Sequence, residues 1–220
     1  MSIKYRCLVL DHDDTAVMST PRIHYPSFTD ALNKLRPDMQ ALSLEQFVLY
    51  CFNPGFSSLC DEILKLSREE KEFQHAVWRI YTEERIPDFY PGFVDFLKEY
   101  KSWGGIVTVV SHSHSDRILR DYDTHCGFTP DMVFGWEQEA HQRKPNPYPV
   151  LEIMKNFGLK EPELLVVDDL NPGLVMAKNC NVEFAGAGWA HEIQEIENYL
   201  RIHSDHYFPT VDMLREWVMG

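Results

Sequence analysis

Residues 7–17 of the chain read CLVLDHDDTAV. The apolar run Cys7–Leu10 leads directly into three aspartates, Asp11, Asp13 and Asp14. A continuous apolar run predicts a strand buried on both faces, and strands ordinarily avoid aspartate. By itself, the acidic cluster is explained equally well as a polar loop or as a functional site, so its meaning depends on the rest of the chain.

Composition limits the class of protein. The chain has 220 residues, enough for one large domain or for a core domain that carries a smaller one. Its formal net charge of −13 repels polyanions, so we expect no nucleic-acid partner. No window approaches the ~20 apolar residues that span a membrane, and no signal-peptide pattern precedes the first strand. Five scattered cysteines without a C-x-x-C pair indicate reduced thiols and a cytoplasmic location. Oligomeric state cannot be inferred from these features.

Three further runs resemble the first strand, and helical patterns precede them. The runs are Gly105–Val110, Leu164–Val167 and Val182–Gly186, and the helical patterns cover 91–103, 148–157 and 172–179. Strands that alternate with helices predict an α/β fold with a Rossmann-like, mainly parallel sheet.

The stretch between Thr15 and Pro91 has a different pattern. It lacks strand-like runs of similar quality and contains helical patterns over 27–35, 43–50, 56–66 and 67–84. Ser67 and Glu70 have the spacing of a capping box. We therefore expect a parallel-sheet core formed by residues 1–15 and 90–220, with residues 16–89 inserted as a helical domain.

Each of the best predicted strands ends in polar residues. The first ends at Asp11–Thr15, the second at Ser111-His112-Ser113 and the third at Asp168-Asp169. Ligands of open parallel sheets bind beyond the carboxyl ends of the strands. The polar clusters are therefore expected to converge on one site, although they lie far apart in sequence.

A cation is required if these aspartates converge. Asp11, Asp13 and Asp169 would repel one another in a low-dielectric cleft. Carboxylates without histidine or thiolate favour a hard ion such as Mg²⁺. Lys144, just before a predicted helix, supplies a second cation, and Ser111 supplies a hydroxyl group. Such a combination is typical of a site that handles phosphate.

The pattern resembles the haloacid dehalogenase superfamily over nearly the whole chain. The four motifs of that superfamily correspond to Asp11–Thr15 (D-x-D-x-T), Val109–Ser111, Lys144–Pro147 and Val166–Asp169, in that order. Any one of these is weak, whereas all four in order are specific. The segment Phe89–Gly92 and the inserted helices also resemble members with a helical C1-type cap, such as phosphoglycolate phosphatase and β-phosphoglucomutase.

The resemblance implies a role for each matched residue. Asp11 would attack phosphorus and form an aspartyl-phosphate, while Asp13 would act as general acid and then as general base. Ser111 and Lys144 would bind the transferring phosphoryl group. We expect the remaining substrate contacts to come from the following residues: His112, and Asn53 and Phe56 in the loop Phe52–Phe56 of the insert.

The same resemblance implies a metal site. Asp11, the backbone carbonyl of Asp13 and Asp169 would hold Mg²⁺, and Asp168 would order its water ligands.

Two positions depart from the usual family pattern. His12 stands where an apolar residue is more usual, and it could line the site or only fill space. Asp14 stands where glycine is commonest. Family members that cleave carbon–halogen bonds lack the acid at Asp13, so its presence disfavours a dehalogenase.

These residues favour a Mg²⁺-dependent phosphatase acting on a small phosphorylated metabolite. A phosphomutase of the same superfamily is the first alternative, although the loop Phe52–Phe56 contains no arginine or lysine to grip a second phosphate. A non-catalytic phosphate-binding relative is the second. A signalling receiver domain uses similar groups but lacks the helical insert.

Overall fold

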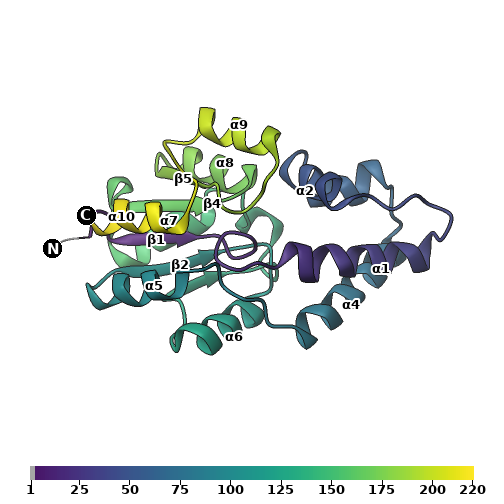
Figure 1. Cartoon of the computed structure of the whole chain (residues 1–220), viewed down its shortest axis with the longest axis horizontal. Helices are drawn as coiled ribbons and strands as arrows, with labels where there is room; N and C mark the ends of the chain where they lie inside the picture. Colours follow the sequence, from purple (N-terminus) through teal and green to yellow (C-terminus); the bar gives the residue numbers. More distant parts are fainter. Residues whose placement is uncertain (1–2) are drawn as a thin grey trace. The chain divides into compact units, whose positions relative to one another are not determined.

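A computed structural model describes residues 3–220 of the chain. It divides into two compact units, shown in Figure 1. The first unit joins the N-terminal residues up to Val17 to Phe89–Gly220, and the second is Met18–Asp88. The interpretation of the second unit as a cap stays a prediction.

The first unit is built on a parallel sheet. Within residues 3–220 this sheet has six strands in the order β3-β2-β1-β4-β5-β6, and every neighbouring pair is parallel. The strands are β1 (Cys7–Leu10), β2 (Ile106–Val110), β3 (Met132–Phe134), β4 (Leu164–Asp168), β5 (Glu183–Ala187) and β6 (His206–Phe208). The predicted α/β, Rossmann-like class is confirmed.

Helices alternate with the strands of the first unit, and the last of them follows β6. They are α5 (Phe93–Ser102), α6 (Ser115–Cys126), α7 (Tyr148–Phe157), α8 (Asn171–Asn179), α9 (Gln194–His203) and α10 (Val211–Met219), with short 3₁₀ turns η3 (Ala140–Gln142) and η4 (Glu161–Glu163). As predicted, α7 stops at Gly158, which takes the left-handed conformation that glycine adopts most readily (φ 62°).

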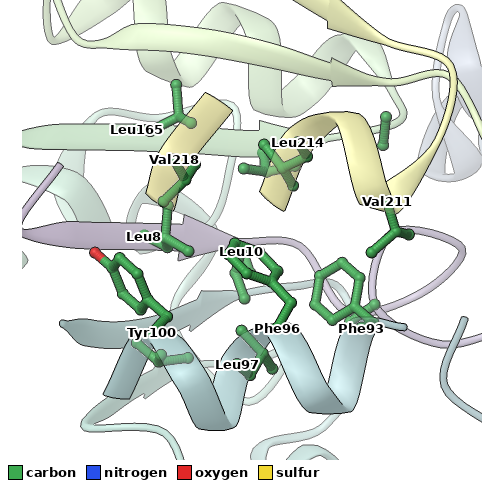
Figure 2. Packing of buried hydrophobic residues seen from close by; sticks show 14 of the residues in the cluster. Leu8, Leu10, Phe93, Phe96, Leu97, Tyr100, Leu165, Val211, Leu214 and Val218 are labelled. Carbon is green, nitrogen blue, oxygen red and sulfur yellow. The ribbon is translucent and has the colours of Figure 1, made fainter. Parts of the chain in front are cut away.

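The core holds the end of β1 in place. Figure 2 shows Leu8 and Leu10 of β1 between the side chains of α5 and α10. Leu8 lies in register with Leu165 of β4, and Phe96 and Leu214 pack in the same buried cluster. Full burial of each such side chain stabilises the fold by about 1.5–3 kcal/mol. The residues that follow β1 therefore start from a rigid base.

The second unit is helical. Its elements are η1 (Thr20–His24), α1 (Tyr25–Leu35), α2 (Leu44–Phe52), α3 (Phe56–Ser58), η2 (Leu59–Ile63) and α4 (Arg68–Glu84). The predicted capping box at Ser67 and Glu70 is present. The helix predicted over 56–66 ends earlier, at Ile63, because Lys65 takes the left-handed conformation (φ 49°), which a right-handed helix cannot contain.

Among residues 3–220, no helix combines the length and the apolar character that crossing a bilayer requires.

Candidate active site

The polar residues leave the sheet at one edge. Leu10 lies in register with Val109 of β2 and with Val167 of β4. Asp11 continues β1, and its amide donates to the carbonyl of Val167 at 2.9 Å. Because parallel strands end on the same side, Asp11, Ser111 and Asp168 emerge together, as the sequence predicts.

Lys144 lies among the carboxylates of this edge. Its Nζ is 2.7 Å from Oδ1 of Asp11 and 2.6 Å from Oδ2 of Asp168, and all three side chains are buried. Burial opposes the charge of Lys144, but the two carboxylates outweigh it and raise the pKa of the lysine. Nε2 of His112 lies 3.0 Å from the carbonyl oxygen of Lys144, so the imidazole of His112 braces the lysine backbone.

Three carboxylates are close enough to share a cation. Asp11, Asp168 and Asp169 each offer an oxygen within 4.8 Å of the others. Burial raises the pKa of Asp11, Lys144 opposes this rise, and the neighbouring carboxylates add to it. The pKa of Asp168 is raised to about 6, again chiefly by burial. Three buried carboxylates against one ammonium, with oxygen donors only, fit a hard divalent cation.

Two serines hold the carboxylate of Asp13. Its Oδ2 accepts from Oγ of Ser113 at 2.5 Å and from Oγ of Ser111 at 3.3 Å. The amide of Ser113 donates to Oγ of Ser111 at 3.1 Å. Ser113 is not among the residues predicted from sequence, although residues two apart in an extended segment face the same way, and this spacing was a usable signal.

Asp169 is held by two side chains. Its Oδ1 accepts from the hydroxyl of Thr15 at 2.8 Å, and its Oδ2 lies 2.6 Å from Nε2 of His191. Burial opposes protonation of His191, but the hydrogen bond and the charges of Asp169 and Asp14 outweigh it and raise the pKa of the histidine. His191 belongs to no predicted motif, and no local pattern singles it out.

The two unusual residues of the first loop have structural explanations. His12 is buried, and its Nε2 lies 3.1 Å from Oδ2 of Asp121, a buried residue of α6. Asp14 has a positive φ of 58°, which explains why glycine is usual there. Aspartate is among the few other residues that enter this conformation readily.

Asn53 and Phe56 both belong to the second unit, where Asn53 is exposed between α2 and α3. Phe56 packs against the rings of Phe28 and Phe47, with centroid distances of 5.9 Å and 6.2 Å. Their predicted contact with substrate stays a prediction.

The parallel sheet thus brings a lysine and four aspartates to its carboxyl edge, a combination that fits the handling of phosphate. The family model for haloacid dehalogenase-like hydrolases matches residues 8–187. The chain belongs to this family, and the resemblance seen in the sequence is confirmed.

Solved structures share the fold over nearly the whole chain. A predicted phosphoglycolate phosphatase from Haemophilus somnus 129PT is 19% identical, with a TM-score of 0.75 and coverage of 97% of this chain and 98% of that chain. A predicted phosphatase from Clostridium acetobutylicum is 18% identical, with a TM-score of 0.77 and 98% of each chain covered. CbbY from Rhodobacter sphaeroides, in complex with phosphate, is 14% identical, with a TM-score of 0.72 and 94% of each chain covered. Likeness at these identities shows the fold.

A comparison with curated protein sequences gave no significant match.

Proposed function

We propose that the protein is a cytoplasmic, Mg²⁺-dependent phosphatase that hydrolyses a small phosphorylated metabolite through an aspartyl-phosphate on Asp11. One observation carries the proposal. The Lys144 ammonium bridges Asp11 and Asp168 at the edge of the sheet where two serines hold Asp13. A buried nucleophile, a fixed cation and an oriented carboxyl group are what transfer of a phosphoryl group requires.

Asp11 acts first. One of its carboxylate oxygens attacks phosphorus, and the bond from phosphorus to the ester oxygen of the substrate breaks. Lys144, 2.7 Å from Oδ1 of Asp11, keeps a positive charge beside the reacting oxygens. In this role Ser111 and Lys144 bind the transferring group, and Asp168 keeps the ammonium in place.

Asp13 moves the protons. Its carboxyl group protonates the leaving oxygen, so that an alcohol departs, and then accepts a proton from the water that attacks phosphorus. The bond between phosphorus and the Asp11 oxygen breaks in this second step, which releases inorganic phosphate and restores the Asp11 carboxylate. The serine hydroxyl groups on its Oδ2 hold the carboxyl group in one orientation during both steps.

A bound Mg²⁺ would neutralise charge on the phosphoryl oxygens. Asp11, the carbonyl of Asp13 and Asp169 would hold the ion, and Asp168 would order its waters. The raised pKa values of Asp11 and Asp168 support this assignment, because they mark buried carboxylates that lack sufficient positive charge.

The class of substrate and the type of reaction are inferred from the family resemblance and from the loop Phe52–Phe56. CbbY has been crystallised with phosphate and, as a mutant, with xylulose-(1,5)-bisphosphate. The loop Phe52–Phe56, which the family resemblance assigns to the leaving group, contains no lysine or arginine. This absence favours a monophosphate and hydrolysis over a mutase, which must also hold a second phosphate.

A panel of phosphorylated metabolites tests the proposal through release of inorganic phosphate. We expect activity with Mg²⁺, none after chelation with EDTA, and a loss to background in Asp11→Asn. Asp13→Asn should lose roughly 10²–10⁴-fold on alkyl phosphates. Asp116→Asn, an exposed position on α6, is the control. Activity that survives chelation would contradict the metal, and a fully active Asp11→Asn variant would contradict the nucleophile.

A further inference from the structure

The segment Trp189–His191 follows β5. It contacts the loop after β1, through Thr15, and the carboxylate of Asp169. Nε1 of Trp189 donates to the backbone carbonyl of Thr15 at 3.0 Å. The indole ring also packs against the rings of Tyr90 and Phe93, at centroid distances of 6.5 Å and 6.2 Å. This aromatic anchor fixes the segment beside the loop that carries Asp11 and Asp13.

The anchored segment brings His191 to Asp169. Nε2 of His191 lies 2.6 Å from Oδ2 of Asp169, and the exposed fractions of the two side chains are 9% and 1%. Thr15 donates to the other carboxylate oxygen at 2.8 Å. Both oxygens of Asp169 thus have a fixed partner, one from the loop after β1 and one from the segment after β5. Rotation of this carboxylate would break at least one buried hydrogen bond.

The contact between His191 and Asp169 has the geometry of a hydrogen bond. His191, Asp14 and Asp169 do offer three ligand atoms within 4.8 Å of one another. At 2.6 Å, however, the imidazole nitrogen lies at hydrogen-bonding distance from the carboxylate oxygen. Because an ionised carboxylate can only accept a hydrogen bond, Nε2 carries the proton in this pair, and the ring orients the carboxylate.

We propose that His191 is a positioning residue that orients Asp169 for a divalent cation, and that Trp189 holds His191 in place. This inference rests on the proposed function, because it takes Asp169 to be a ligand of the ion. Side chains that hydrogen-bond to metal ligands fix the direction of the ligand lone pairs. Asp169 then meets the ion without first having to be ordered.

Mg²⁺ binding to the substrate-free protein tests the proposal by isothermal titration calorimetry. His191→Leu should bind Mg²⁺ about 10–100-fold more weakly than the wild type, the usual effect of losing such a partner. His191→Gln should recover part of the loss, because its amide can donate to Asp169. Trp189→Phe keeps an aromatic ring but loses the donor to Thr15, and it should show a smaller loss than His191→Leu.

His203→Leu is the matched control, since this histidine is exposed at the end of α9. Circular dichroism melts check that each variant is folded. If His191→Leu fails to fold, the comparison of His191→Gln and Trp189→Phe with the wild type decides the question. A merely structural role for His191 would lower thermal stability and leave the affinity of the folded fraction for Mg²⁺ unchanged.

The outcomes separate this inference from the proposed function. Equal Mg²⁺ affinity in the wild type and the His191 variants would overturn the positioning role alone. A wild type that binds no Mg²⁺ would contradict the metal assignment, and both proposals with it. Two ions in the wild type and one in His191→Leu would make His191 a direct ligand, and would also overturn the positioning role.

Discussion

His12 connects the loop that follows β1 to helix α6. Its backbone carbonyl accepts from the amides of Ala16 and Val17, both at 3.0 Å, and so closes the turn that carries Asp13. Its imidazole pairs with the buried carboxylate of Asp121, on α6. A residue that would usually fill space is therefore a polar link, and its Nδ1 is buried without a hydrogen-bond partner in the structure.

Because of this contact, we expect mutations of His12 and Asp121 to have coupled effects on the free energy of unfolding. Asp121→Leu leaves a buried ring N–H without an acceptor, at a cost of about 1–3 kcal/mol. His12→Leu instead leaves a buried carboxylate with less support. The double variant removes both polar groups and should be destabilised by less than the sum of the single effects, which urea unfolding measures.

Asp123→Leu, on an exposed position of the same helix, is the control for the His12–Asp121 cycle. Its effect should simply add to that of His12→Leu. Additive effects for His12 and Asp121 as well would show that the two side chains do not support each other.

Arg36 connects three segments of the second unit, which is helical. Arg36 follows α1, and its Nε and Nη2 donate to the two carboxylate oxygens of Glu70 in α4, at 2.8 Å and 2.7 Å. Its Nη1 donates to the carbonyl of Leu64 at 2.7 Å, just after η2. A bidentate pair of this kind fixes orientation as well as distance.

We expect the Arg36–Glu70 pair to make the stability of the second unit depend on pH. The hydrogen bonds from Arg36 and the amide of Ser67 lower the pKa of Glu70 to about 2. A carboxyl group with a lowered folded-state pKa stabilises the fold above its unfolded pKa, roughly 4.3, and loses that contribution as the pH falls toward about 2. Glu70→Gln should therefore lower the denaturation midpoint at pH 7, and the difference from wild type should shrink at pH 3.

Glu72→Gln is the control for Glu70→Gln, because Glu72 pairs with Arg68 within α4 at a largely exposed position. Exposed pairs of this kind contribute little to stability. An equal effect of Glu72→Gln and Glu70→Gln at pH 7 would contradict the role given to Arg36.

Strands β1, β2 and β4 could be predicted because each is a continuous apolar run, buried on both faces. The edge strands β3 and β6 are three residues long and mostly half-buried, so they are too short to stand out in the sequence as strands. Short pieces of this kind become strands only because a neighbour offers hydrogen bonds.

Some residues of the candidate site could likewise be predicted from the sequence, and others could not. Asp11, Ser111 and Asp168 could be predicted to meet because each directly follows or ends a recognisable strand. His191 and Asp121 could not, because their partners are set by how a loop and a helix pack in three dimensions. Nothing in the local spacing of either residue points to Asp169 or to His12.

The negative charge of the whole molecule limits how an anionic substrate can bind. The chain carries a formal net charge of −13, which repels an anionic substrate at long range. Lys144 is buried between two aspartates, and its charge is largely neutralised by them. On the proposed account, binding of a phosphate monoester therefore depends on the positive charge that a bound metal would add at the sheet edge.

On the proposed mechanism, Asp11, and no other aspartate of its loop, takes the phosphoryl group. The most direct measurement is to quench Asp13→Asn during turnover of an activated aryl phosphate. Borohydride then reduces the acyl phosphate, so that the modified aspartate becomes homoserine, and peptide mass spectrometry locates it. Asp13→Asn is used because slow hydrolysis should let the aspartyl-phosphate accumulate. We expect homoserine at position 11. When Asp11 is also changed to Asn, we expect neither homoserine nor an initial burst of released phenol. Homoserine at position 14, or a burst of phenol that survives Asp11→Asn, would contradict it.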